Sequence, residues 1–493
     1  MLSGAPGLPL SSPFDDDKLH EECGVYGVFG AQGAASFVAL GLHALQHRGQ
    51  EAAGIVSHDA TTGEFHTVRR LGYVRDNFTS AKVIAALPGT HALGHVRYST
   101  AGGKGATAIR DVQPLYAELN SGGFSIAHNG NLVNADALRA ELIERGSIFQ
   151  SSSDTECIVH LMARSIQKTV AERMKDALRR VEGAFSVVAI TRSKLIGVRD
   201  PLGVRPLALG RVGDTWILSS ETCALDIVGA ELVRDVEPGE MVIISKEGVE
   251  SIFPFTRAKP RFCIFEYVYF SRPDSVIDGL SVYEARRRIG AELAREAPVE
   301  ADLVCPVPDS GTPAAIGFSQ QSGIPFAMGI IRNQYVGRTF IEPSEQIRNM
   351  GVRLKLNVNR AVIAGKRVVL VDDSVVRGTT SLKIKEMVLD AGAREVHLRV
   401  ASPPTVWPCF YGVDTPEKDK LLAAQMTEEQ MRAHLGVDSI RFVSLDGLYR
   451  ACGIDEGRDA AAPRFCDACF SGDYPVPPSD QIAKGKIKLP NSR

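Results

Sequence analysis

The sequence predicts an α/β protein with two different kinds of sheet, and three observations support this. The composition is ordinary for a globular protein, with 44% hydrophobic and 23% charged residues, and a length of 493 residues suggests two to three domains. Up to about residue 250, short strands dominate among a few helices, which is typical of a layered α/β sandwich. From about residue 281, strands and helices alternate, which is the pattern of a parallel sheet.

The first half begins with a strand over 23–30, where glycines separate Val and aromatic residues and allow close backbone neighbours. A helix with apolar spacing is expected over 33–46. Further strands are predicted over 54–57, 92–97, 124–128, 185–190 and 216–219, with helices near 154–168 and 171–181.

The second half alternates strands over 304–307, 367–371 and 396–400 with helices near 313–321 and 380–391. Residues 333–357 are polar, contain Gly337 and Gly351 and lack periodicity, so we expect a lid there. Residues 456–493 are rich in Pro, Asp and Lys, and we expect an exposed tail except at Cys466 and Cys469.

Charge and cysteine content exclude several classes of protein. Lys and Arg number 56 against 58 Asp and Glu, a net charge of −2, which argues against nucleic-acid binding. We expect no membrane span, because no apolar run approaches about 18 residues. The first 22 residues lack the charge pattern and apolar core of a secretory signal, so a reducing, cytoplasmic compartment is expected. Nine cysteines are too few for a disulfide scaffold and should be core residues, nucleophiles or metal ligands.

A phosphate-binding pattern occupies residues 368–380. An apolar strand ends in two adjacent carboxylates, and a glycine-containing loop then leads into a helix. Backbone N–H groups at that helix start form an anion site, while the carboxylates can hold ribose hydroxyls or hydrated Mg²⁺. A second strand end, with a small-residue loop before Pro313, repeats the arrangement more weakly. The candidate ligands of a sugar phosphate are Asp309, Ser310, Gly311, Asp372, Asp373, Ser374, Arg377, Gly378, Thr379 and Thr380.

A second pattern suits amide hydrolysis. Removal of residues 1–22 would make Cys23 the N-terminal residue, and an α-amino group with a pKa of about 7.7–8.0 can act as base for the thiol. Asn129 and Gly130 can supply oxyanion donors. Arg97 and Asp154 suit the carboxylate and ammonium of a glutamine substrate. Taken singly, Cys23 could be a buried core thiol, and Asn129 and Gly130 could form a turn. Arg97 could belong to a structural ion pair, and Asp154 could cap a helix.

Taken together, these residues and the run from Gln46 to Glu51 resemble the class II glutamine amidotransferases, which have an N-terminal nucleophile (Ntn) hydrolase fold. The 368–380 pattern resembles the phosphoribosyl pyrophosphate (PRPP) fingerprint of type I phosphoribosyltransferases. The family that joins both halves in this order is the glutamine phosphoribosylpyrophosphate amidotransferase family. The resemblance runs from Cys23 to about residue 470.

This resemblance implies a propeptide (1–22), an Ntn αββα sandwich (23–255), a phosphoribosyltransferase domain with a parallel sheet (256–455) and a C-terminal segment (456–493). It implies glutamine hydrolysis at Cys23 and internal transfer of ammonia to PRPP, giving 5-phosphoribosylamine, glutamate and pyrophosphate in the first committed step of purine synthesis. It also implies a homo-oligomer, specifically a tetramer, and inhibition by purine nucleotides.

The resemblance further implies Mg²⁺ at Ser310, Asp372 and Asp373, with Arg338 and Arg348 of the lid shielding the pyrophosphate. Cys466 and Cys469 can bind one metal centre, but spacing alone cannot choose their partners among Cys263, Cys305, Cys409 and Cys452. Resemblance to the bacterial subgroup with a cleaved propeptide selects Cys263 and Cys409 and implies a [4Fe–4S] cluster, with zinc or no metal as alternatives. The remaining cysteines, Cys157, Cys223, Cys305 and Cys452, are expected in the core.

Two competing functions remain open. A different amidotransferase, making an amino sugar phosphate or asparagine, would share the first half but not the carboxylates and loop over 372–380. A PRPP-sensing regulator with an inactive glutaminase half would not need Cys23, Arg97, Asn129, Gly130 and Asp154 together.

Overall fold

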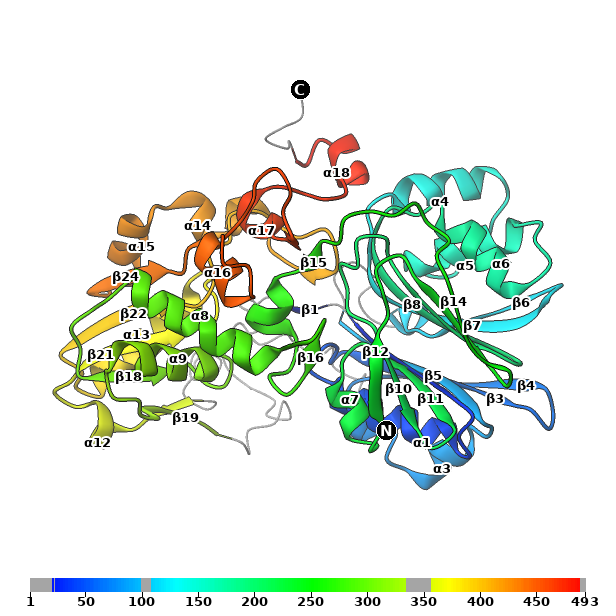
Figure 1. Ribbon diagram of the computed structural model, residues 1–493, viewed down its shortest axis with the longest axis horizontal. Coiled ribbons are helices and arrows are strands. Elements are labelled where there is room, and N and C mark those ends of the chain that lie inside the picture. Colours follow the sequence, from blue (N-terminus) through cyan, green and yellow to red (C-terminus); the bar gives the residue numbers. More distant parts are fainter. Residues whose placement is uncertain (1–19, 22, 99–107, 334–355, 488–493) are drawn as a thin grey trace, which may run out of the picture.

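The computed structural model describes residues 20–21, 23–98, 108–333 and 356–487. Figure 1 shows two lobes, one with two stacked sheets between helices and one with a smaller sheet flanked by helices. The C-terminal segment passes from the second lobe to the first. Within the described residues, no helix combines the length and apolar character that a membrane span requires.

Two antiparallel sheets form the first lobe, with strand orders β12-β10-β11-β2-β5-β3-β4 and β14-β13-β9-β8-β7-β6. The strands of the seven-stranded sheet are β2 (Gly24–Phe29), β3 (Ala52–Asp59), β4 (Glu64–Leu71), β5 (His91–Arg97), β10 (Ala208–Val212), β11 (Thr215–Ser219) and β12 (Glu231–Asp235). Those of the six-stranded sheet are β6 (Leu115–Leu119), β7 (Gly122–Leu132), β8 (Gly183–Thr191), β9 (Leu195–Arg199), β13 (Met241–Ser245) and β14 (Gly248–Ile252).

Apolar residues on both faces of each sheet explain the layering, because alternate side chains point to opposite faces. Val25, Leu93 and Val188 pack between the two sheets. The helices of this lobe are α1 (Ala34–Ala44), α2 (Val74–Asn77), α3 (Ala81–Ala85), α4 (Ala135–Glu144), α5 (Thr155–Arg164), α6 (Val170–Leu178), α7 (Cys223–Asp226) and the 3₁₀ turn η2 (Ala108–Asp111). Since α1 and α7 cover one outer face and α4–α6 the other, the predicted αββα sandwich is confirmed (Figure 1).

The second lobe contains a parallel sheet of order β18-β21-β22-β24, as predicted, with helices on both faces. One face packs against α8 and α9, and the other against α13 and α15. The strands are β18 (Leu303–Pro306), β21 (Arg367–Asp372), β22 (Glu395–Val400) and β24 (Ser439–Phe442). The helices are α8 (Val282–Glu296), α9 (Thr312–Ser322), α12 (Arg360–Ile363), α13 (Thr379–Asp390), α14 (Leu422–Gln425), α15 (Glu428–Leu435) and α16 (Leu445–Ala451), with the short turns η3 (Glu266–Phe270) and η4 (Lys418–Lys420).

Short strand pairs connect distant parts of the chain. β19 (Ile330–Arg332) pairs with β20 (Leu356–Val358), so the two ends of the segment expected to form a lid lie side by side. Arg338 and Arg348 lie outside the described residues. β16 (Val276–Ile277) pairs with β17 (Leu280–Ser281), and β1 (His20–Glu21) pairs with β23 (Val413–Asp414), which brings the segment before Cys23 onto the second lobe.

The prediction of an exposed C-terminal tail is wrong for the described residues up to 487. β25 (Phe465–Cys466) pairs with β15 (Phe262–Cys263), and the short helices α17 (Ala468–Ser471) and α18 (Ser479–Ala483) follow. Tyr474 is buried. The Asp480 carboxylate accepts hydrogen bonds from the N–H groups of Asp136 and Ala137 at 2.7 and 3.2 Å. A carboxylate at a helix start satisfies otherwise unpaired donors, so the tail caps α4 of the first lobe.

Candidate functional site

Cys23 lies immediately before β2 in an unusual backbone conformation. Its φ is +84°, in the left-handed region that residues with a Cβ rarely adopt, and its side chain is buried. The Cys23 N–H donates to the carbonyl of Arg48 at 3.1 Å. Gly24 pairs with Val96, so Cys23 and Arg97 each adjoin the last residue pair of β2 and β5. A buried thiol residue in this strained conformation is consistent with a nucleophile rather than a packing residue.

The run from Gln46 to Glu51 explains how this end of the sheet is held. A Cβ on Gly49 would lie 2.5 Å from the backbone nitrogen of Arg97, so only glycine allows this approach. Arg48 is fully buried, which rules out ordinary surface charge for this residue. Its guanidinium donates to Glu221 and, at 2.7 Å, to Glu266.

Asn129 and Gly130 lie on β7, where they face β8. The Asn129 side chain is completely buried, and neither its amide nitrogen nor its amide oxygen has a hydrogen-bond partner among the described residues. Buried amides without partners are rare in native proteins because each lost hydrogen bond costs about 1–3 kcal/mol. A substrate oxyanion would supply the missing partner of the Asn129 NH₂ group.

Arg97 and Asp154 have partners that hold them in place. The Arg97 guanidinium lies 3.5 Å from the carboxylate of Asp111. Asp154 precedes α5 and accepts hydrogen bonds from the N–H groups of Leu132 and Thr155 at 3.0 and 2.8 Å. Burial favours a raised pKa for Asp154, but His128 and these donors outweigh it, so the pKa is lowered and the carboxylate stays charged. Asp154 is therefore both a helix cap and an available anion.

The candidate phosphate site lies where two parallel strands end. Val304 pairs with Val369 and Pro306 with Val371, so the loops after β18 and β21 meet at one edge of the sheet. Ser310 and Ser374 both donate to the carboxylate of Asp373, at 2.5 and 2.8 Å. The contact between Ser310 and Asp373 brings together two motifs that lie 63 positions apart in the sequence.

Two helix starts face this edge. Gly311 precedes α9 and Gly378, with φ +82°, precedes α13, so both loops end in N–H groups. Thr379 and Thr380 form the first turn of α13. Asp372 and Asp373 are buried, whereas Asp309 is exposed and bound by Arg332 at 2.6 Å. The arrangement can bind an anionic group at the helix start and hydroxyls or a cation at the carboxylates.

A buried ionic network between the two sites involves residues that sequence reasoning did not single out. Glu221 accepts from His47, Ser275 and the N–H of Arg272 at 2.6, 2.7 and 2.8 Å. Glu266 accepts from Arg205 at 3.0 Å. Burial favours a raised pKa for Glu221, but Arg48 and His47 outweigh it and the pKa is lowered. A lone acidic residue in the apolar run 262–270 was the available sequence signal for Glu266.

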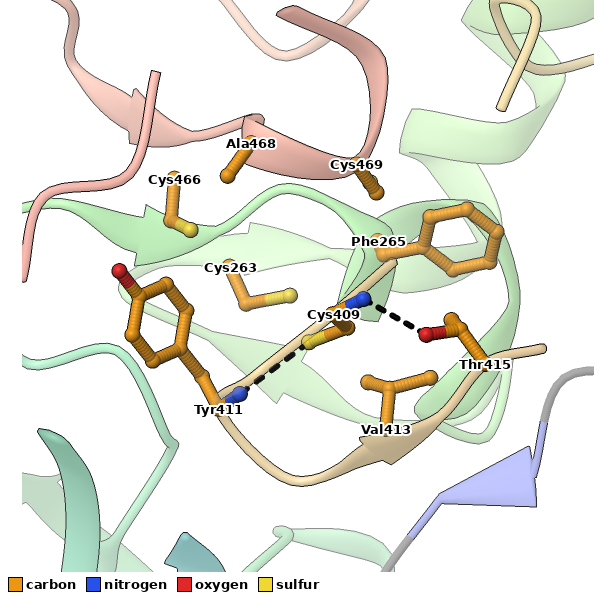
Figure 2. A pocket seen from close by; sticks show the side chains of 9 residues that line it. All are labelled: Cys263, Phe265, Cys409, Tyr411, Val413, Thr415, Cys466, Ala468 and Cys469. Carbon is orange, nitrogen blue, oxygen red and sulfur yellow. Dashed lines mark hydrogen bonds between the residues drawn. The ribbon is translucent and has the colours of Figure 1, made fainter. Parts of the chain in front are cut away.

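Four cysteines line one small cavity, of about 20 Å³ (Figure 2). Cys263 comes from β15, Cys409 from the loop before β23, and Cys466 and Cys469 from the C-terminal segment. The N–H of Tyr411 donates to the Cys409 sulfur at 3.3 Å. Cys157, Cys223, Cys305 and Cys452 are buried elsewhere, as expected for core residues.

The chemistry of this cavity suits thiolate ligands of a metal centre. Burial raises the pKa of the Cys466 thiol, and the neighbouring Cys263 raises it further. Thiols with raised pKa values are neutral until a cation stabilises the thiolates. Among the described residues, no group of three or more His, Cys, Asp or Glu side chains is already arranged to hold a metal ion. Four cysteine thiolates are a donor set of structural metal centres.

The chain is similar to known proteins over most of its length. Residues 103–226 match the family described as a glutamine amidotransferase domain. Amidophosphoribosyltransferase of Rhizobium etli is 56% identical over 481 residues, covering 96% of each chain. The Bacillus subtilis enzyme of that name is 48% identical over 460 residues, covering 93% of this chain and 95% of its own.

Two solved structures are similar over nearly the whole chain. One is glutamine PRPP amidotransferase from B. subtilis complexed with ADP and GMP, with a TM-score of 0.86, 45% identity and coverage of 92% of this chain and 97% of the other. The second is titled as the allosteric regulatory enzyme of purine biosynthesis, with a TM-score of 0.88, 44% identity and coverage of 95% and 100%.

The buried His95 beside Arg97 leads to a prediction about pH. Burial and, to a lesser extent, the nearby Arg97 lower the pKa of His95 to about 3. The Nε2–H of the His95 ring donates to the carbonyl oxygen of His128 at 3.2 Å. Between pH about 6.5 and 3 the unfolded chain binds the proton that the folded chain excludes, so stability falls as pH falls. Between pH 6.5 and 5, we expect the free energy of unfolding of His95→Gln to fall by about 2 kcal/mol less than that of the wild type.

Urea unfolding at a series of pH values measures this difference. His43→Gln, at an exposed position on α1, is the matched control and should keep the wild-type pH dependence. An unchanged slope in His95→Gln would show that other groups cause the acid sensitivity.

Proposed function

The chain belongs to the amidophosphoribosyltransferase family, and we propose that its two sites form one enzyme that makes 5-phosphoribosylamine, glutamate and pyrophosphate from glutamine and PRPP. This is a glutamine amidotransferase of purine biosynthesis. The observation that carries the proposal is that one chain holds a buried Asn129 amide without a partner among the described residues, a Cys23 in a strained backbone conformation, and the carboxylates at the end of β21. A different amidotransferase would have no use for that second site.

At the first site, the Cys23 thiol attacks the side-chain amide of glutamine after its proton passes to the α-amino group. The Asn129 amide and the Gly130 N–H stabilise the oxyanion, and Arg97 and Asp154 bind the substrate carboxylate and ammonium. The proton then leaves with ammonia, and water releases glutamate from the γ-glutamyl thioester. The lowered pKa of Asp154 supports this assignment, because the carboxylate is charged when the ammonium arrives.

At the second site, the start of α13 would bind the 5-phosphate through N–H groups, the hydroxyls of Thr379 and Thr380 and the flanking Ser374 and Arg377. The loop at Asp309, Ser310 and Gly311 would receive the pyrophosphate. Ser310, Asp372 and Asp373 would hold a Mg²⁺ ion, which neutralises pyrophosphate charge when bound. The oxygen-only donor set around Asp373 supports this choice. Ammonia attacks C1 of the ribose as the pyrophosphate leaves.

We also propose that residues 1–22 are a propeptide removed before activity. With Glu22 attached, the Cys23 nitrogen is an amide whose lone pair is delocalised into the carbonyl and cannot accept the thiol proton. Its N–H already points to the Arg48 carbonyl, so a freed amine would start in a defined orientation.

The cysteine cavity supports a proposed [4Fe–4S] cluster held by Cys263, Cys409, Cys466 and Cys469. Such a cluster has a structural role here, because both reactions already have their chemical groups and neither transfers electrons. It would join the segment after the first lobe, the loop before β23 and the C-terminal segment, which lie far apart in the sequence.

Regulation and assembly are proposed from the relatives. A solved relative is complexed with ADP and GMP, and we propose that purine nucleotides bind to this chain and inhibit it. We also propose that the chain forms a homo-oligomer, specifically a tetramer, as the family resemblance implies.

Separate variants should divide the two reactions. Cys23→Ala should abolish glutamine-dependent synthesis but leave ammonia-dependent synthesis near the wild-type rate, because only the first site needs the thiolate. Asp373→Asn should reduce both by at least about tenfold, because both reactions end at PRPP. Pyrophosphate release with glutamine, then with ammonium, measures both. A PRPP-sensing regulator would release no pyrophosphate in either assay, and equal losses in Cys23→Ala would mean that Cys23 is structural.

Processing can be checked by the mass of active protein. The expected species begins at Cys23, and a variant with Cys23→Ala should retain residues 1–22 if the thiol itself performs the cleavage. Full glutaminase activity in protein that still carries Glu22 would contradict the amine-base mechanism.

Metal content tests the cluster. Anaerobically purified protein should contain about four iron and four sulfide per chain, and Cys466→Ser should lose both together with folding stability. Cys452→Ser, a buried cysteine outside the cavity, is the matched control and should keep its iron. Colourless protein with one zinc per chain would replace the cluster by a zinc site, and iron loss in the control instead would show that the ligand choice is wrong.

A further inference from the structure

The second lobe touches the oxyanion loop, which we define as residues 129–131 of β7. The Asn131 side-chain amide donates to the carbonyl of Phe410 at 2.9 Å, across 279 positions of sequence. Gly412 lies against the same loop, since a Cβ added to it would be 3.0 Å from the Cα of Gly130. The loop that carries the proposed oxyanion donors thus has direct contacts with the chain segment 410–412.

Gly130 has backbone on both sides. Its φ is +139°, and a Cβ on it would lie 2.0 Å from the carbonyl oxygen of Ala184 on β8. Gly412, with φ +102°, also lies against Gly130, since a Cβ on Gly412 would be 3.0 Å from the Gly130 Cα. Because the backbones of Ala184 and Gly412 both approach Gly130 this closely, the Gly130 peptide has little freedom to shift.

Segment 410–412 is itself anchored. The buried Arg205 donates to the carbonyl of Tyr411 at 2.9 Å and to Glu266 at 3.0 Å. The Tyr411 hydroxyl donates to the carbonyl of Val476 at 2.5 Å. The segment is therefore fixed by a buried ion pair and by the C-terminal chain, and it can act as a firm support for the oxyanion loop.

We propose that Asn131 and Gly412 are positioning residues for glutamine hydrolysis, so that the second lobe completes the glutaminase site. The inference rests on the proposed function of Cys23 and Asn129. Oxyanion donors act only when aimed at the developing charge, and a misplacement of about 1 Å can cost about 100-fold in rate. The Asn129 side chain has no hydrogen-bond partner within the part of the chain that the structure describes, so its orientation depends on the backbone that Asn131 and Gly412 hold.

The test uses the full-length processed protein with three readouts: glutamine hydrolysis, ammonia-dependent synthesis, and the rate of Cys23 alkylation by iodoacetamide. Alkylation needs the thiolate but no oxyanion donor, so it separates the two requirements. Asn131→Ala, Asn131→Asp and Gly412→Ala should lower kcat for glutamine hydrolysis by about 10- to 100-fold. Alkylation and ammonia-dependent synthesis should stay within about twofold of wild type.

Matched controls remove similar features elsewhere. Asn77→Ala loses side-chain amide donation to the carbonyls of Leu71 and Tyr73, and Gly453→Ala places a Cβ at φ +89° with nothing within 4 Å. Both should hydrolyse glutamine at nearly the wild-type rate.

Unchanged hydrolysis in all three variants would overturn the proposal while leaving the proposed function intact. A parallel fall in alkylation or in ammonia-dependent synthesis would overturn it too, since the contacts would then support the fold in general. A wild-type protein that hydrolyses no glutamine would instead refute the proposed function.

Discussion

One buried guanidinium shared by two buried carboxylates underlies the arrangement of both sites. Arg48 donates to Glu221 and Glu266, and Arg205 pairs with the other oxygen of Glu266, so two cations balance two anions away from solvent. Each buried ion carries a desolvation cost of several kcal/mol, and losing one partner leaves a charge uncompensated at a cost of about 3–5 kcal/mol. The charges of the network are paired only when the segments bearing Arg48, Glu221 and Glu266 lie in this one arrangement. The network therefore fixes the relative orientation of these segments more than it adds to the stability of the fold.

Each member of this network also holds a group near a reacting centre. The Arg48 carbonyl receives the Cys23 N–H, and Arg205 holds the Tyr411 carbonyl beside the oxyanion loop. On the other side, Arg286 donates to the carbonyls of Tyr267 and Ser271 around η3. Burial lowers the pKa of Arg286 to about 10, although Asp373 and Glu221 both oppose this shift, so the guanidinium stays charged and lies in the field of both sites.

The phosphate site rests on a different constraint. Parallel strands end at one edge of their sheet, so β18 and β21 bring Ser310 and Asp373 together. This site depends on sheet topology inside one lobe, whereas the amide site depends on contacts between lobes. The second lobe alone therefore accounts for the geometry of the phosphate site, whereas the geometry of the amide site requires both lobes.

Local patterns in the sequence were enough to predict many of the strands and helices, the two kinds of sheet and the loop after Asp373, and to single out Cys23 as a candidate nucleophile, because periodicity and turn chemistry act over a few residues. Tertiary structure alone decided the burial of Arg48, the orphaned amide of Asn129, the approach of Gly412 to Gly130 and the docking of Asp480 on α4. It also placed Cys263 and Cys409, rather than Cys305 or Cys452, around the cavity with Cys466 and Cys469. These contacts join residues that are up to 344 positions apart, and no spacing rule acts over such a distance.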